Sequence, residues 1–276
     1  MVSEVRPTAL DALDSTPPHD AAARVGALGT ILGVWAHPDD EVYLSAGVMR
    51  LALENGQRVV CITATAGEHG TDDPVTWPAA TLRTQRRQEL HDGLAVLAAG
   101  QLRTIEHHWL DHEDGRCAEA DLERAAGRLR DLIESVEPDT ILTFGPDGMT
   151  GHPDHRTVAR WVSAALEGRP DILRLDAVAA RSWIDQFEPS DDIAGYFDDG
   201  YPHLVDDAAV ALHISPDGDL RSNKEAALRA HTTQTPPVIE ELGPRLWHAF
   251  SNTESFAVHS TDVTPINDQH ESHLST

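Results

Sequence analysis

The chain has 276 residues, enough to bury a sizeable core in one large α/β domain without disulfides, and it contains only two cysteines. Its formal net charge is −25 with Lys224 as the only lysine, so its average surface field repels the phosphates of nucleic acids. No stretch approaches the ~18 consecutive apolar residues of a membrane span, and no secretory signal pattern is present. We therefore expect a cytoplasmic protein that binds neither nucleic acid nor membrane.

The two ends of the chain differ in composition from its middle. Residues 1–26 carry three prolines among scattered acids and alanines, which predicts a loosely ordered N-terminal extension. Residues 260–276 are polar and lack hydrophobic periodicity, which predicts a C-terminal tail. The interval 27–259 is expected to form one domain.

Apolar runs alternate with helical patterns along this domain in the βαβ manner. This alternation predicts an α/β, Rossmann-like three-layer fold with a mostly parallel sheet and helices on both faces. The expected strands are 30–36, 58–64, 103–109, 139–144, 175–180 and 208–214. The expected helices are 40–54, 81–98, 119–136, 153–167 and 218–230.

The turn after the first expected strand reads Ala36-His37-Pro38-Asp39-Asp40-Glu41. A dinucleotide-binding fold would place its glycines in this turn, whereas Gly26, Gly29 and Gly33 precede the strand or lie within it. The turn instead presents carboxylates and an imidazole, which suit a cation rather than a pyrophosphate.

A related pattern, Gly151-His152-Pro153-Asp154-His155-Arg156, follows a later strand. Because proline is favoured at the first helical position, His37 and His152 are predicted to be helix N-caps, with Asp40 and His155 at the third position. Open α/β sheets bind ligands beyond the carboxyl ends of their strands, so both turns are expected to point into one small volume. Two histidines and one carboxylate would make an open zinc site there.

Roles follow from the chemistry of such a site. We assign His37, Asp40 and His155 as metal ligands, since a catalytic zinc takes three protein ligands and keeps one position for water. The same set also suits iron(II), cobalt or manganese. Asp39 is assigned as general base and acid, with support of His37 or helix capping as its alternative. His152 is assigned to the oxyanion of a tetrahedral intermediate, with a structural hydrogen bond as its alternative.

Both patterns resemble those of the LmbE-like (PIG-L) family of zinc-dependent N-deacetylases, which includes deacetylases of N-acetylglucosaminyl compounds and mycothiol-conjugate amidases. The resemblance covers about residues 30–235 and extends to Thr65-Ala66-Gly67-Glu68, Arg86-Arg87-Gln88-Glu89-Leu90, and Lys224 through His231-Thr232-Thr233-Gln234. It implies a Rossmann-like fold and the same five assignments: metal on His37, Asp40 and His155, base at Asp39, and oxyanion-side imidazole at His152.

The resemblance also implies substrate contacts. The family arginine that matches Arg86 contacts sugar hydroxyls, Asp114 lies in a loop similar to one that faces substrate, and His231 and Gln234 are predicted to close the pocket. The residues alone allow other interpretations. Arg86 and Glu89 could form a surface ion pair, Asp114 could belong to an ordinary turn, and His231 could interact with a helix dipole.

The predicted reaction is hydrolytic removal of an acetyl or other acyl group from the amino nitrogen of a sugar-containing small molecule, by attack of metal-bound water with Asp39 as general base. Alternatives are cleavage of a thiol-conjugate amide, deacylation of an antibiotic intermediate, or a metal-containing sugar-binding protein without turnover. Thr150 stands where some mycothiol-pathway relatives have a tyrosine, which leaves the substrate open. The oligomeric state is also open.

Overall fold

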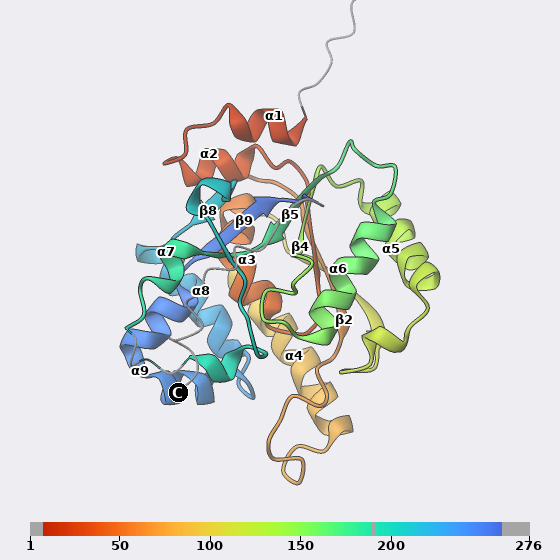
Figure 1. Cartoon of the computed structure of the whole chain (residues 1–276), viewed down its shortest axis with the longest axis vertical. Helices are drawn as coiled ribbons and strands as arrows, with labels where there is room; N and C mark the ends of the chain where they lie inside the picture. The colour runs from red at the N-terminus through yellow and green to blue at the C-terminus, as the bar shows by residue number, and fades with distance from the viewer. Residues whose placement is uncertain (1–7, 189–190, 192, 261–276) are drawn as a thin grey trace, which may run out of the picture.

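A central sheet with helices on both faces forms the molecule (Figure 1). The computed structural model describes residues 8–188, 191 and 193–260. The sheet has the order β3-β2-β1-β4-β5-β9-β8. Its strands are β1 (Ile31–Trp35), β2 (Val59–Thr65), β3 (Glu106–His112), β4 (Thr140–Phe144), β5 (Leu173–Ala177), β8 (Leu212–Ile214) and β9 (Glu254–Val258). A small separate pair joins β6 (Ala179–Ala180) to β7 (Leu204–Val205).

Five neighbouring strands of the sheet, from β3 to β5, run parallel, and β9 and β8 add an antiparallel edge. The chain moves outward from β1 through β2 to β3, then returns to the opposite side of β1 through β4 and β5. Because parallel crossovers are right-handed, this reversal puts the connecting helices on opposite faces. The predicted Rossmann-like α/β fold is confirmed.

The helices divide between the two faces. α5 packs on α6 on one side, while α3, α4 and α8 pack together on the other (Figure 1). The helices are α1 (Ala9–Asp14), α2 (Ala21–Gly26), α3 (Asp40–Glu54), α4 (Ala79–Ala98), α5 (Leu122–Val136), α6 (Pro153–Ala165), α7 (Arg181–Ile184), α8 (Gly218–Ala230) and α9 (Thr235–Ser251). In the described part of the chain, no helix is both long and apolar enough to cross a membrane.

The two strands beneath the site are buried along their whole length. β1 and β4 consist almost entirely of apolar or β-branched residues, as is typical of central parallel strands covered on both faces. Trp35 ends β1 and Phe144 ends β4, and their rings pack edge to face with centroids 5.2 Å apart. These two packed rings support the loops that come after β1 and β4.

Some elements lie outside the expected set. The expected N-terminal extension includes α1 and α2, whose Leu13 and Val25 are fully buried in the core. Helix α9 and strand β9 follow the last expected helix, and β9 joins β5 to β8. Apart from Ser260, the expected C-terminal tail lies outside the described residues.

Candidate active site

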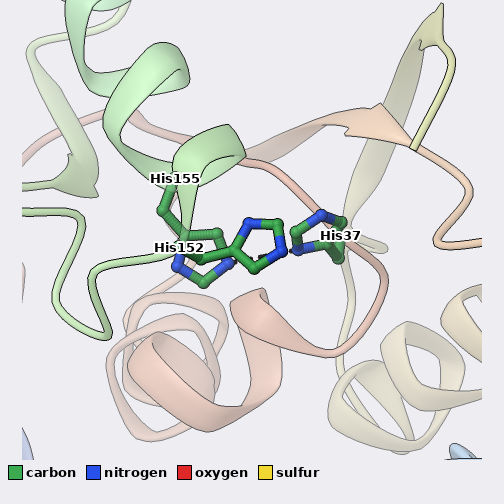
Figure 2. A group of neighbouring side chains, drawn as sticks. All are labelled: His37, His152 and His155. Atoms are coloured by element: carbon green, nitrogen blue, oxygen red, sulfur yellow. Dashed lines mark hydrogen bonds between the residues drawn. The ribbon is translucent and has the colours of Figure 1, made fainter. Parts of the chain in front are cut away.

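Two loops meet beyond the carboxyl ends of β1 and β4, where the strand order reverses. His37 follows β1 by two residues, and His152 and His155 stand at the start of α6. Figure 2 shows the three imidazoles gathered in one place, and one ring nitrogen of each lies within 4.8 Å of the others. Open α/β sheets bind ligands at this reversal point.

The second turn has the predicted helix-start geometry. His152 is the N-cap of α6, Pro153 is its first residue, and His155 is its third. The Nδ1 atom of His152 accepts the backbone N–H of Asp154 at 3.2 Å. The imidazole therefore satisfies one of the free donors of the helix start.

The first turn differs from the prediction. Helix α3 begins at Asp40, and its N-cap is Asp39, in the left-handed conformation with φ of 106°. The prediction that His37 is the N-cap is therefore wrong. The Asp40 carboxylate explains why, because it accepts the backbone N–H groups of Ala36 at 3.2 Å and His37 at 2.8 Å and closes the turn on itself.

The three predicted ligands converge. Nδ1 of His37 lies 3.1 Å from Nε2 of His155, and the Asp40 carboxylate lies 3.8 Å from the first and 3.4 Å from the second. Tetrahedral zinc with bonds of ~2.0–2.2 Å holds its donors about 3.3–3.6 Å apart. The two ring nitrogens are close to this spacing, and each faces a different oxygen of the Asp40 carboxylate, Oδ2 for His37 and Oδ1 for His155. The three side chains therefore surround one small volume between the two loops.

The outer nitrogens of the two imidazoles support the same conclusion. Nε2 of His37 faces a carboxylate oxygen of Asp114 at 3.1 Å, and Nδ1 of His155 donates to the carbonyl of Gly148 at 3.0 Å. Both outer nitrogens face acceptors, so each carries a proton. The inner nitrogens face each other across 3.1 Å, so positive charge belongs between them, either a bound cation or a second proton on His37.

The pKa values of these imidazoles reflect the same surroundings. Burial lowers the pKa of His37, but hydrogen bonds to Asp114 and Asp154 outweigh it and raise that pKa to about 10. Burial lowers the pKa of His155 to about 4, so this ring is neutral and its Nε2 can act as a ligand. Its face stacks on Phe144 with centroids 4.1 Å apart, which fixes its orientation.

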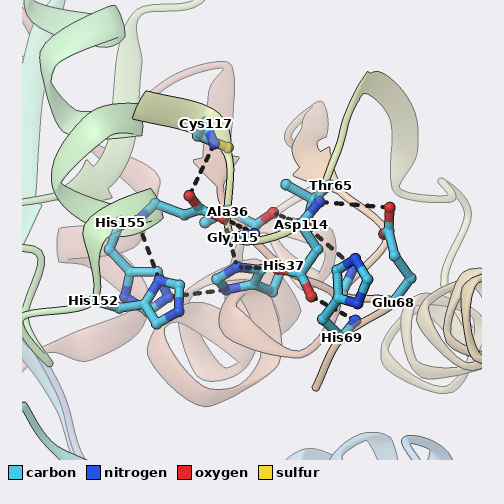
Figure 3. A network of polar contacts seen from close by, with 12 residues as sticks. Ala36, His37, Thr65, Glu68, His69, Asp114, Gly115, Cys117, His152 and His155 are labelled. Atoms are coloured by element: carbon cyan, nitrogen blue, oxygen red, sulfur yellow. Dashed lines mark hydrogen bonds and ion pairs between the residues drawn. The ribbon is translucent and has the colours of Figure 1, made fainter. Parts of the chain in front are cut away.

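Asp114, predicted to face substrate, lies behind His37. One of its oxygens faces His37 and the other accepts the N–H of His69 at 2.9 Å (Figure 3). The fully buried Asp154 stands 3.4 Å from the same His37 nitrogen and accepts the N–H groups of Gly115 and Cys117 at 2.7 and 3.0 Å. Carboxylates in this position orient a ligating imidazole and raise its basicity.

Arg86 holds in place the turn that carries Asp39, the predicted general base. Its guanidinium donates to the carbonyls of Pro38 and Gly67 at 2.6 and 2.9 Å and to the Asp39 carboxylate at 3.2 Å, and the side chain is buried. Gly67 has φ of 63°, and a Cβ there would overlap the guanidinium. The carboxylate of Glu41 accepts the Asp39 N–H at 3.1 Å and thus holds its left-handed backbone.

Asp39 has an unusual pKa. Burial raises it to about 7, against the lowering effect of the Arg86 guanidinium. A carboxylic acid near this value can both take up and return a proton at neutral pH.

The two distant family-like motifs contact each other. The buried Glu89 accepts hydrogen bonds from the hydroxyls of Thr232 and Thr233 at 2.6 and 2.8 Å and from the Thr233 N–H at 3.0 Å. The alternative of a surface ion pair between Arg86 and Glu89 therefore does not hold. Glu89 instead ties α4 to the turn before α9, where Gln234 stands.

A cavity of about 260 Å³ opens beside the predicted ligands. Asp39, Asp40, His155 and Gln234 line it, whereas His231 does not. The His231 side chain is fully buried, with Nε2 3.6 Å from Glu41, and burial lowers its pKa to about 3. Of the predicted substrate contacts, the structure thus puts Gln234 on the cavity wall and buries Arg86, Asp114 and His231 behind the site.

Sequence reasoning did not identify the rest of this wall. Its aromatic members come mainly from α7, α9 and the loop between β6 and β7, segments in which the sequence shows no recognisable motif. It also missed the pairing of Lys224 with Glu254, whose atoms lie 2.8 Å apart in the interior. Lysine is almost never fully buried unless paired, so the only lysine in an acidic chain was a usable signal.

Comparison with known proteins identifies relatives of the chain. The family model described as PIG-L, GlcNAc-PI de-N-acetylase, matches residues 32–166. The chain is 30% identical to a probable N-acetyl-alpha-D-glucosaminyl L-malate deacetylase 2 of Bacillus subtilis, over 78% of this chain and 88% of that one. It is 29% identical to a 1D-myo-inositol 2-acetamido-2-deoxy-alpha-D-glucopyranoside deacetylase of Streptomyces avermitilis, over 80% and 86%.

The fold is shared with a solved structure as well. The N,N'-diacetylchitobiose deacetylase of Pyrococcus horikoshii superimposes with a TM-score of 0.61 at 18% identity, over 93% of this chain and 92% of that one. From the sequence relatives, the family model and this shared architecture together, we conclude that the chain belongs to the PIG-L family.

Proposed function

We propose that this protein is a metal-dependent hydrolase that removes an acetyl or other acyl group from the amino nitrogen of a sugar-containing small molecule. The observation that carries the proposal is the convergence of His37, Asp40 and His155, of which Asp40 and His155 line a cavity together with Asp39. The named activities of the sequence relatives, which are deacetylases of acetamido sugars, support it.

Zinc is the cation we propose, held by His37, Asp40 and His155. Two imidazoles and one carboxylate are a common ligand set of catalytic zinc, although iron(II) accepts them too. When bound, such a cation acts as a Lewis acid that activates water and polarises an amide carbonyl. Asp114 contacts the outer nitrogen of His37 and the Gly148 carbonyl that of His155, and these contacts hold both imidazoles in place.

Asp39 is the proposed proton carrier. Its carboxylate accepts a proton from the attacking water and returns it to the departing amine, so the C–N bond breaks and a free amine and a carboxylate form. Arg86 and the Glu41 carboxylate hold Asp39 in place through its side chain and its backbone. The left-handed backbone at Asp39 is the kind of strain that accumulates at active sites.

His152 is the proposed stabiliser of the oxyanion. Its Nδ1 accepts the Asp154 N–H, so the proton of the neutral ring sits on Nε2. Burial lowers the pKa of His152, with a further contribution from His37, which keeps the ring neutral at pH 7. Its ring packs edge to face against His37, with centroids 4.8 Å apart, so its Nε2–H can serve the reaction centre.

The test combines metal content with amine release. Protein purified without added metal is analysed for elements and assayed for amine release from N-acetylglucosamine derivatives. We expect about one equivalent of a divalent metal, and Asp39→Asn should keep that metal while losing about 10²–10⁴-fold in rate. Asp131→Asn, an exposed carboxylate on α5, is the matched control. Less than half an equivalent of metal, or full activity of Asp39→Asn, would overturn the proposal.

A further inference from the structure

The wall of the cavity beyond the metal ligands is aromatic. We call the side chains of Tyr43, Trp183, Tyr196, Phe197 and Phe250 the aromatic chamber; all five line the same cavity as Asp39, Asp40 and His155. In a chain with only 5% aromatic residues, such a concentration at one site is a strong local bias. The rings come from α3, α7, α9 and the loop between β6 and β7.

The chamber is organised around Phe250. Its ring lies 5.1 Å from Tyr196, 6.2 Å from Tyr43, and 6.3 Å from both Trp183 and Phe197, measured between centroids. The Trp183 indole N–H donates to the carbonyl of Ala249 at 3.1 Å, which fixes that ring. The rings are therefore pre-arranged before any ligand enters, which lowers the entropic cost of binding.

The chamber is not simply a continuation of the core. Four of its five side chains keep partial exposure, and only Trp183 is buried. Rings that served packing alone would bury their faces, as Trp35 does beneath the site. Partly exposed rings that line an open cavity indicate a surface made for a ligand.

The hydroxyl groups of the two chamber tyrosines contact other protein groups. The Tyr196 hydroxyl donates to Glu241 at 2.8 Å, and the Tyr43 hydroxyl lies 3.4 Å from that of Thr235. Glu254, also on the wall, is bound to Lys224 at 2.8 Å. A polyhydroxylated group placed against these rings, rather than against the polar part of the wall near Thr150, Gln234 and Thr253, would lose hydrogen bonds to water without regaining them, which is costly.

We propose that the substrate carries an apolar group, aryl or alkyl, that enters the aromatic chamber when its amide lies at the metal ligands. This inference rests on the proposed function and narrows its substrate class. A dry apolar cavity of about 150 Å³ accepts benzene, so the 260 Å³ present here has room for a ring and its linker.

The apolar group can belong to either of two parts of the substrate, the aglycone or the acyl group, and one substrate panel distinguishes them. The aglycone arm compares methyl with phenyl N-acetylglucosaminide, and the acyl arm compares N-acetyl with N-phenylacetyl glucosamine. We expect kcat/KM to rise about 10- to 100-fold with the phenyl group in one arm, as burial of an aromatic side chain predicts. A change of less than about twofold in both arms would overturn the inference.

Variants test whether the aromatic chamber causes the preference for phenyl substrates. Phe197→Ala and Phe250→Leu are expected to reduce the phenyl-to-methyl ratio of kcat/KM at least fivefold. Trp109→Leu, which changes a partly exposed ring on the outer strand β3, should leave that ratio as it is. Because the wild-type panel needs no variant, a misfolded variant leaves the inference testable. Ratios equal to wild type in both folded chamber variants would contradict it.

Direct binding separates this inference from the proposed function. Calorimetry on metal-free wild-type protein should show phenyl N-acetylglucosaminide binding about tenfold or more tightly than the methyl compound. If the phenyl compound binds more tightly but no amine is released at any metal loading, the proposed hydrolase function is wrong and the inference about the aromatic chamber is supported. Amine release at equal rates, with equal affinity for both compounds, would refute the chamber and leave the hydrolase standing.

Discussion

Asp114→Asn tests whether this carboxylate serves the metal site or the substrate. In the structure its oxygen is 3.1 Å from Nε2 of His37, the nitrogen that faces away from the metal position. Loss of such an outer partner typically weakens metal binding about 10- to 100-fold. Asp154 remains 3.4 Å from the same nitrogen, so we expect the lower end, about tenfold or 1.4 kcal/mol. Asp114→Ala also empties the space and should approach 100-fold.

Competition with a chromogenic chelator measures metal affinity, and kcat and KM are then compared at saturating metal. Asp111→Asn is the control, because this carboxylate is exposed and pairs with Arg87 instead. We expect the Asp114 variants to regain most of kcat once metal saturates. Unchanged metal affinity together with a raised KM would refute our reasoning and support the original prediction that Asp114 contacts substrate.

Four further predictions concern proton transfer, the backbone and stability. His152→Asn keeps an N-cap acceptor but removes the imidazole, so kcat should fall about 10²–10³-fold at constant metal content. An unchanged kcat would mean that His152 serves only as the N-cap of α6. Gly67→Ala should displace the guanidinium that lowers the pKa of Asp39, raising that pKa and moving the acid limb of the pH–rate profile to higher pH. Lys224→Met should cost about 3–5 kcal/mol in urea unfolding by leaving Glu254 buried and unpaired, and adding Glu254→Gln should recover part of it. Burial lowers the pKa of His107 to about 3, so stability should fall as the pH drops below about 6.5, where the unfolded histidine takes up a proton, and His107→Gln should flatten that dependence.

The fold could be read from the sequence where local pattern and tertiary environment agree. Strand β1 and helices α3 and α8 appear within a residue of their expected bounds, because a continuous apolar run or an amphipathic repeat decides them. Strand β9 escaped prediction because it opens with Glu254 and Ser255, polar residues that are buried through partners distant in sequence. No local pattern records such partners.

The residues of the site also divide into those that local sequence predicts and those that it does not. Short spacing within each turn predicted that His37, Asp40 and His155 lie near one another, and they do, since the sheet topology determines where the two loops meet. Their role as metal ligands stays a prediction. The position of Arg86 behind Asp39 depends on a helix that crosses from another part of the sheet, and the aromatic wall depends on loops with no repeat or motif. The sequence therefore predicts which side chains of short motifs meet more readily than it predicts the cavity wall around them.

The single lysine also makes the folded state easy to monitor. Lys224 is 3% exposed and donates to both Glu254 and the Tyr43 carbonyl, so its amine is shielded from reagents in the native protein. Amine-reactive labels should then leave Lys224 unmodified in the native protein, and a lysine-specific endoprotease should cut only molecules that have opened around α8. Cleavage at this one bond would report local opening directly, without any engineered probe.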